Sequence, residues 1–104
     1  MNDFEVIFRE IKKDLGDIIK IEDYLVIENK KASIVLSTVR FMGSIEVLVD
    51  FTYDFFISHI ESENSFRFKT IKFEKIIDLI NEIKRDINDL RELECAYIEG
   101  SNFV

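Results

Sequence analysis

The stretch SIEVLVDFTYDFFISHI, residues 44–60, decides the fold because its side chains alternate in character along its whole length. Every second residue from Ile45 onward is aliphatic or aromatic, until His59 ends the series. Successive side chains of a strand point to opposite faces of its sheet, so this series predicts the core face of one long strand. The intervening positions predict an outer face that mixes acids with apolar residues: Glu46, Leu48, Asp50, Asp54, Phe56 and Ile60.

Polar or glycine-containing segments divide the neighbouring sequence into further strands. Turns are expected at 29–31, 41–44 and 61–65, and Gly43 suits a turn that requires a positive φ. Together with the long strand, these turns predict an antiparallel meander of four strands: 24–28, 32–40, 44–60 and 66–71.

A two-residue loop at 42–43 would set the register of the central hairpin. In that register Ile34 lies opposite Phe51, so that apolar residues meet on one face. The last hairpin stays open, because a shift of one residue decides whether Phe66 and Phe68 face the core or the outside.

Apolar residues at helical spacing precede the strands. They recur on one face from Phe4 to Leu15 and predict a helix over 3–15. Asn2 or Asp3 can cap its start, and a glycine at position 16 suits a left-handed stop.

A second apolar stripe follows the strands and predicts a helix over 73–95. Its members are Phe73, Ile76, Ile77, Ile80, Ile83, Ile87, Leu90 and Leu93. The order helix, four strands, helix predicts an α+β fold: a four-stranded antiparallel meander with both helices packed on one face. The stripe is explained either by packing on the sheet or by a homodimer seam, to which the last turns would contribute.

Size and composition predict a single domain over 1–104, with 96–104 as a loose tail after the helix. The chain has 104 residues, of which 47% are hydrophobic, enough for one core. A lone cysteine, Cys95, excludes an internal disulfide, and the sequence shows no signal peptide and no apolar run of membrane-spanning length. We therefore expect a cytoplasmic protein without contact to a membrane.

The charge balance disfavours direct binding of nucleic acid. The chain has 21 acidic and 14 basic residues, for a net charge of −7. Nucleic-acid binding requires a basic stripe, whereas an acidic chain favours a protein partner with a basic surface.

Catalytic and cofactor motifs are absent from the sequence, so we expect neither an enzyme nor a bound cofactor. No phosphate-binding glycine motif occurs. In one long strand, Asp50 and Asp54 would lie about 13 Å apart and His59 would face the other way, which argues against a metal site. Cys95 and His59 are the only pair that could serve nucleophilic catalysis, and each is better explained by packing.

Two surfaces are candidates for partner binding. The first is the outer face of the long strand, where Leu48 and Phe56 would anchor a partner and Glu46, Asp50 and Asp54 would orient it. A plain solvated sheet is the alternative for this face. The second surface is an acidic group near the end of the long helix: Asp86, Asp89, Glu92, Glu94 and Glu99. A plain solvated helix face is the alternative for this group.

These features predict a small acidic protein-binding module. Frequent Ile, Lys, Asn and Phe have AT-rich codons and favour a bacterial or phage source. Small acidic proteins of this type resemble immunity proteins, antitoxins and anti-CRISPR inhibitors, although no single motif carries the resemblance. We therefore expect a stoichiometric inhibitor that covers a basic, nucleic-acid-binding surface of its partner. The alternative is a homodimeric structural, adaptor or chaperone-like subunit.

Overall fold

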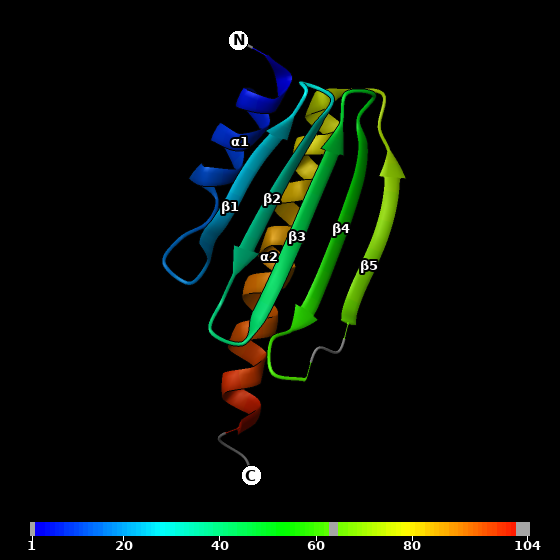
Figure 1. Cartoon of the computed structure of the whole chain (residues 1–104). Coiled ribbons are helices and arrows are strands. Elements are labelled where there is room, and N and C mark those ends of the chain that lie inside the picture. Colours follow the sequence, from blue (N-terminus) through cyan, green and yellow to red (C-terminus); the bar gives the residue numbers. More distant parts are fainter. Residues whose placement is uncertain (1, 63–64, 102–104) are drawn as a thin grey trace.

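A computed structural model describes the backbone of residues 2–62 and 65–101, and the side chains of 2–62 and 68–96. Five strands form one antiparallel sheet in the order β1-β2-β3-β4-β5, and both helices lie on the same face of it (Figure 1). The elements are α1 (Asp3–Lys13), β1 (Lys20–Ile27), β2 (Lys31–Ser37), β3 (Phe41–Leu48), β4 (Thr52–His59), β5 (Ser65–Lys72) and α2 (Ile76–Ser101). The α+β meander is confirmed, but the predicted count of four strands is wrong.

The extra strand arises because residues 44–60 form most of a hairpin, β3–β4, instead of one long strand. Val47 pairs with Tyr53, and the turn between the strands is closed by a hydrogen bond from Phe51 N to Leu48 O at 2.9 Å. Phe51 adopts the left-handed conformation, with φ 65°, which glycine or asparagine usually supplies. Paired residue numbers in this hairpin sum to an even number, so odd-numbered residues stay on one face across the turn. The alternation therefore continues unbroken through a chain reversal.

The turn between β2 and β3 was predicted in the wrong place. The chain reverses directly after Thr38, whose backbone N donates to Phe41 O at 2.9 Å, and β3 already begins at Phe41. Ile34 therefore pairs with Ile45 and not with Phe51. Gly43 lies inside β3, where a Cβ atom would stand 3.2 Å from Leu90 Cδ2. This glycine makes room for a helix side chain and does not form a turn.

The first helix matches its prediction closely. The side chain of Asn2 accepts a hydrogen bond from Glu5 N at 2.9 Å and so caps α1. Gly16 has φ 67° and follows the helix end. Phe4, Ile7 and Ile11 are buried against the sheet.

The second helix differs from its prediction at both ends. It begins at Ile76, three positions later than expected, because Phe73 N donates to Phe51 O at 3.0 Å and continues the strand layer. It runs to Ser101, so residues 96–101 of the expected loose tail are helical, while 102–104 lie outside the described residues. Figure 1 shows that the end of α2 extends beyond the edge of the sheet.

The apolar stripe of α2 packs on the sheet of its own chain. Five of its residues are buried in the shared core: Leu79, Ile80, Ile83, Ile87 and Leu90. Leu79 was not in the predicted stripe, and Ile77, which was, remains 56% exposed. The core side of the sheet meets them with inward residues of β2, β3 and β4: Ala32, Ile34, Leu36, Phe41, Ile45, Val47, Tyr53, Phe55 and Ile57. Burial of these stripe residues leaves them unavailable for a dimer seam. No helix in the described part of the chain has an apolar stretch long enough to cross a membrane.

Candidate protein-docking face

The face of the sheet turned away from both helices, here called the outer face, is not covered by any other described element of the chain (Figure 1). The strand register brings its side chains into rows across β3, β4 and β5. Glu46 lies opposite Asp54, and Asp54 lies opposite Thr70. In the next row Phe56 lies between Ser44 and Phe68.

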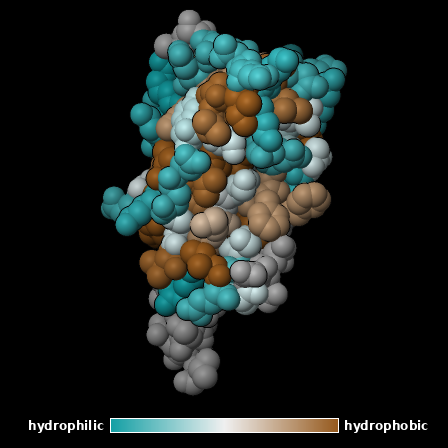
Figure 2. All heavy atoms as spheres, in the orientation of Figure 1, coloured by the Kyte–Doolittle hydropathy of each residue, from teal (hydrophilic) through white to brown (hydrophobic). Residues whose placement is uncertain are grey.

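Several large apolar side chains on this face remain in contact with solvent. Phe68 is 74% exposed and Leu25 is 51% exposed. Other exposed members are Ile27, Met42 and Leu48. Figure 2, which looks onto this face, shows apolar patches separated by polar ones. A solvated antiparallel sheet keeps such residues sparse, so this composition is typical of a protein-binding surface.

A hollow of about 390 Å³ lies in the middle of β3, β4 and β5 on this face. Its lining combines aromatic and polar residues: Ser44, Glu46, Asp54, Phe55, Phe56, Phe68 and Thr70. Three residues predicted for partner binding, Glu46, Asp54 and Phe56, therefore meet around one depression. A fourth, Leu48, lies on the same face at the end of β3.

The outer face carries both signs of charge, whereas the sequence predicted acids and apolar residues there without bases. Lys31 Nζ lies 3.1 Å from Glu46 Oε1. Lys72 shares the row of Thr52, and its Nζ is 4.0 Å from Asp50 Oδ2. The outer face therefore has no uniform sign of charge. Its acidic part is the hollow, whose charged lining residues are Glu46 and Asp54.

Asp50 lies in the turn between β3 and β4, to one side of the hollow. Its carboxylate accepts a hydrogen bond from Thr52 N at 3.0 Å. The hydrogen bonds from Thr52 hold the pKa of Asp50 below its usual value. The structure thus gives Asp50 a turn-stabilising contact and separates it from Asp54.

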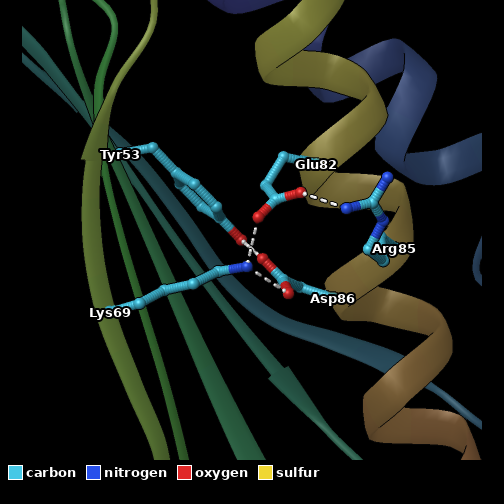
Figure 3. A network of polar contacts seen from close by, with 5 residues as sticks. All are labelled: Tyr53, Lys69, Glu82, Arg85 and Asp86. Carbon is cyan, nitrogen blue, oxygen red and sulfur yellow. Dashed lines mark hydrogen bonds and ion pairs between the residues drawn. The ribbon is translucent and has the colours of Figure 1, made fainter.

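Asp86 is wholly buried between α2 and the sheet, so its prediction as a surface residue is wrong. Its carboxylate accepts hydrogen bonds from Tyr53 Oη and from Lys69 Nζ, each at 2.7 Å (Figure 3). Lys69 Nζ also donates to Glu82 Oε2 at 2.6 Å, and Arg85 pairs with the other oxygen of Glu82 at 3.2 Å. This cluster, the inner network, fastens α2 to β4 and β5.

Protonation in the inner network follows from burial and charge pairing. Burial raises the pKa of Tyr53 well above its usual value, and the adjacent Asp86 carboxylate adds to this. Burial would lower the pKa of Lys69, but its hydrogen bonds with Asp86 and Glu82 outweigh burial and raise that pKa. At neutral pH the lysine is therefore charged and the phenol is a neutral donor.

The remaining helix acids do not form one surface either. Glu94 is buried, and it accepts hydrogen bonds from Arg40 N at 2.7 Å and Arg40 Nη1 at 3.0 Å. It thereby anchors the turn between β2 and β3 to α2. Glu92 is exposed and accepts from Asn88 Nδ2 at 3.2 Å, while Asp89 is half-buried. Glu99 lies outside the described side chains.

The residues considered for catalysis occupy separate places. His59 is buried at the end of β4, where Nδ1 lies 3.0 Å from Ser62 Oγ. Cys95 is exposed on α2. The described residues contain no group of three or more His, Cys, Asp or Glu side chains that could hold a metal ion. Asp50 and Asp54 do not share one long strand as predicted, since Asp50 lies in the turn and Asp54 in β4.

Comparisons with protein-family models, with curated proteins and with solved structures found no match to this chain.

Phe68 and Thr70 complete the hollow, and sequence reasoning did not place them. Phe68 was left between two registers of the last hairpin, and the structure pairs it with Phe56 on the outer face. Phe66, the other residue in question, lies outside the described side chains. No signal in the sequence indicated this alignment, because lysine usually faces solvent and Lys69 faces α2 only through its ion pairs with Glu82 and Asp86.

Proposed function

We propose that this protein is a non-catalytic protein-binding module that docks on a partner protein through its outer face. The observation that carries the proposal is an uncovered sheet face that combines exposed apolar side chains with a hollow lined by Phe68. Large, exposed side chains on a rigid scaffold are typical anchors of protein interfaces. They would supply residence time, whereas the net charge of −7 would speed association with a basic partner.

The use that best fits such a module is stoichiometric inhibition, of the kind performed by immunity proteins, antitoxins or anti-CRISPR inhibitors. The module would cover a basic surface on which the partner normally binds nucleic acid. The distribution of charge supports this role only in part, because lysines share the outer face with the acids. We therefore assign orientation to Glu46 and Asp54, and anchoring to Leu48, Phe56 and Phe68.

The test compares the natural protein with two variants that each lose exposed apolar side chains. Leu48→Ser combined with Phe68→Ser removes anchors from the outer face, whereas Ile77→Ser removes an exposed apolar side chain from α2. Affinity capture from a bacterial lysate with quantitative mass spectrometry should show a partner whose recovery falls at least tenfold in the first variant alone. Equal recovery of the partner by the natural protein and by both variants would contradict docking through the outer face.

Self-association of the outer face is a distinct outcome. Light scattering after size exclusion distinguishes it, because a homodimer through this face would become a monomer in the Leu48→Ser, Phe68→Ser variant. That result would replace the inhibitor proposal with the structural-subunit alternative.

A further inference from the structure

The hollow on the outer face pairs an aromatic wall with the carboxylate of Asp54. Asp54 Oδ1 accepts a hydrogen bond from Thr70 Oγ1 at 2.5 Å. Among the residues that the structure describes, no basic side chain forms an ion pair with Asp54. Its neighbour Glu46 is paired with Lys31. The hollow therefore retains one net negative charge, at Asp54.

Phe56 and Phe68 stand beside this carboxylate. They are paired residues on β4 and β5, and Phe56 is the second residue after Asp54 on the same face. With 74% of its surface exposed, Phe68 leaves ring area open to a ligand. A cation beside this ring and this carboxylate would be attracted by two interactions: a cation–π contact with the ring and a charge-assisted hydrogen bond with the carboxylate.

Arginine fits this combination better than lysine does. A guanidinium group is planar, so it can stack on a phenyl ring while its N–H groups donate to a carboxylate. Its hydration is weaker than that of an ammonium group, which lowers the cost of entering a shallow site. The hollow of about 390 Å³ has room for one such side chain.

We propose that the hollow receives an arginine side chain of the partner protein, with its guanidinium stacked on Phe68 and hydrogen-bonded to Asp54. Ser44 and Thr70 line the same depression and would contact the aliphatic stem. The inference rests on the proposed function, because it specifies which chemical group of the partner the outer face recognises.

The test uses the intact protein and a short probe, the peptide Ac-Gly-Ser-Arg-Ser-Gly-NH2, titrated in an ¹⁵N-correlated NMR experiment. We expect saturable shifts confined to the amides around the hollow, chiefly Ser44, Glu46, Asp54, Phe56, Phe68 and Thr70. The same peptide with citrulline in place of arginine keeps the shape and removes the charge, and it should give shifts at least fivefold smaller. A lysine peptide should bind more weakly than the arginine peptide.

Two variants sharpen the result, and each must first show the dispersed spectrum of a folded protein. Asp54→Asn should weaken arginine binding at least fivefold, whereas Asp23→Asn, a matched change of an exposed acid elsewhere in the sheet, should not. Phe68→Leu keeps an apolar side chain without a ring and should also weaken binding. Equal shifts with citrulline, or arginine shifts spread over other acids, would overturn the inference.

The outcomes also separate this inference from the proposed function. If arginine does not bind the hollow but the outer-face variant still loses its partner, the docking face stands and the arginine assignment is wrong. If arginine binds the hollow but the outer-face variant retains its partner, the site chemistry stands and the docking face is wrong.

Discussion

The two faces of the sheet place the same kind of residue in opposite environments. On the covered face, Asp86 is fully buried and shares its two oxygens between Tyr53 and Lys69. On the outer face, Asp54 is half-exposed and is bonded to a single threonine hydroxyl. Removing either partner from a buried pair is costly, whereas a surface acid can be changed at little cost. An acid in this sequence therefore stabilises the fold or stays accessible to a partner, according to what covers it.

The largest expected effect separates these two aspartates. Asp86→Ala should lower the free energy of unfolding by about 3–5 kcal/mol, because it leaves the buried Tyr53 hydroxyl without its acceptor and takes from half-buried Lys69 one of its two carboxylate partners. Asp54→Ala should change it by no more than about 0.5 kcal/mol. Urea unfolding monitored by circular dichroism measures both. Equal losses would mean that the two faces do not differ as described.

A steric change on the covered face should have the next largest effect. Gly43→Val should cost about 1–3 kcal/mol, because its side chain would enter the space of Leu90. Leu90→Ala is itself destabilising, but combined with Gly43→Val it should cost at least about 1 kcal/mol less than the sum of the single changes. Strict additivity in the double-mutant cycle would show that Leu90 is not what excludes a side chain at position 43.

Alkaline pH should weaken the covered face selectively. The folded protein holds the pKa values of Lys69 and Tyr53 above their usual values, so above about pH 10 the unfolded chain loses these protons first. The contribution of these two groups to the free energy of unfolding is therefore complete below that pH. Above it, the free energy of unfolding falls by up to about 1.4 kcal/mol per pH unit for each group. Urea unfolding between pH 9 and 11 should show a shallower decline for Tyr53→Phe than for the natural protein. An unchanged slope in that variant would exclude the phenol as a contributor.

The smallest expected effect concerns the most exposed ring. Phe68→Ser should change the free energy of unfolding by no more than about 0.5 kcal/mol, because that side chain buries little surface in the isolated chain. Thermal unfolding measures this change. Substitution of Phe68 should thus reduce partner binding while it leaves stability almost unchanged. A loss of more than about 2 kcal/mol would place Phe68 in the core and remove it from the docking face.

Much of the fold could be predicted from periodicity, and the failures have identifiable physical causes. The α1 helix carries an explicit cap at Asn2 and a left-handed stop at Gly16, so both ends were readable. The hairpin within residues 44–60 could not be predicted in this way. Its turn preserves the alternation, and Phe51 occupies a left-handed position where glycine or asparagine is usual. Gly43 looked like the missing turn signal, whereas its absent side chain serves a contact with Leu90 far away in the sequence.

The candidate site was predictable to the extent that alternation assigns faces. Glu46, Leu48, Asp54 and Phe56 were assigned to the outer face correctly, since the period of two survives the hairpin. Asp86 was not, because helical periodicity treats an acid as solvent-facing unless a buried base is known to meet it. That base, Lys69, comes from the edge strand 17 residues away, and only the tertiary fold brings the two together.

Lys69 also explains why the last strand has one alignment. β5 lies at the edge of the sheet and pairs only with β4 among the described strands. A slip of one residue would turn Lys69 to the outside and leave Asp86 buried without its cation, facing either Phe68 or Thr70. A single misplaced charge would then cost more than the strand could regain through its apolar contacts. The ion pair therefore selects the alignment of β5, because it destabilises the shifted pairing more than it stabilises the observed one. In this way a contact on the covered face keeps Phe68 turned toward the outer face.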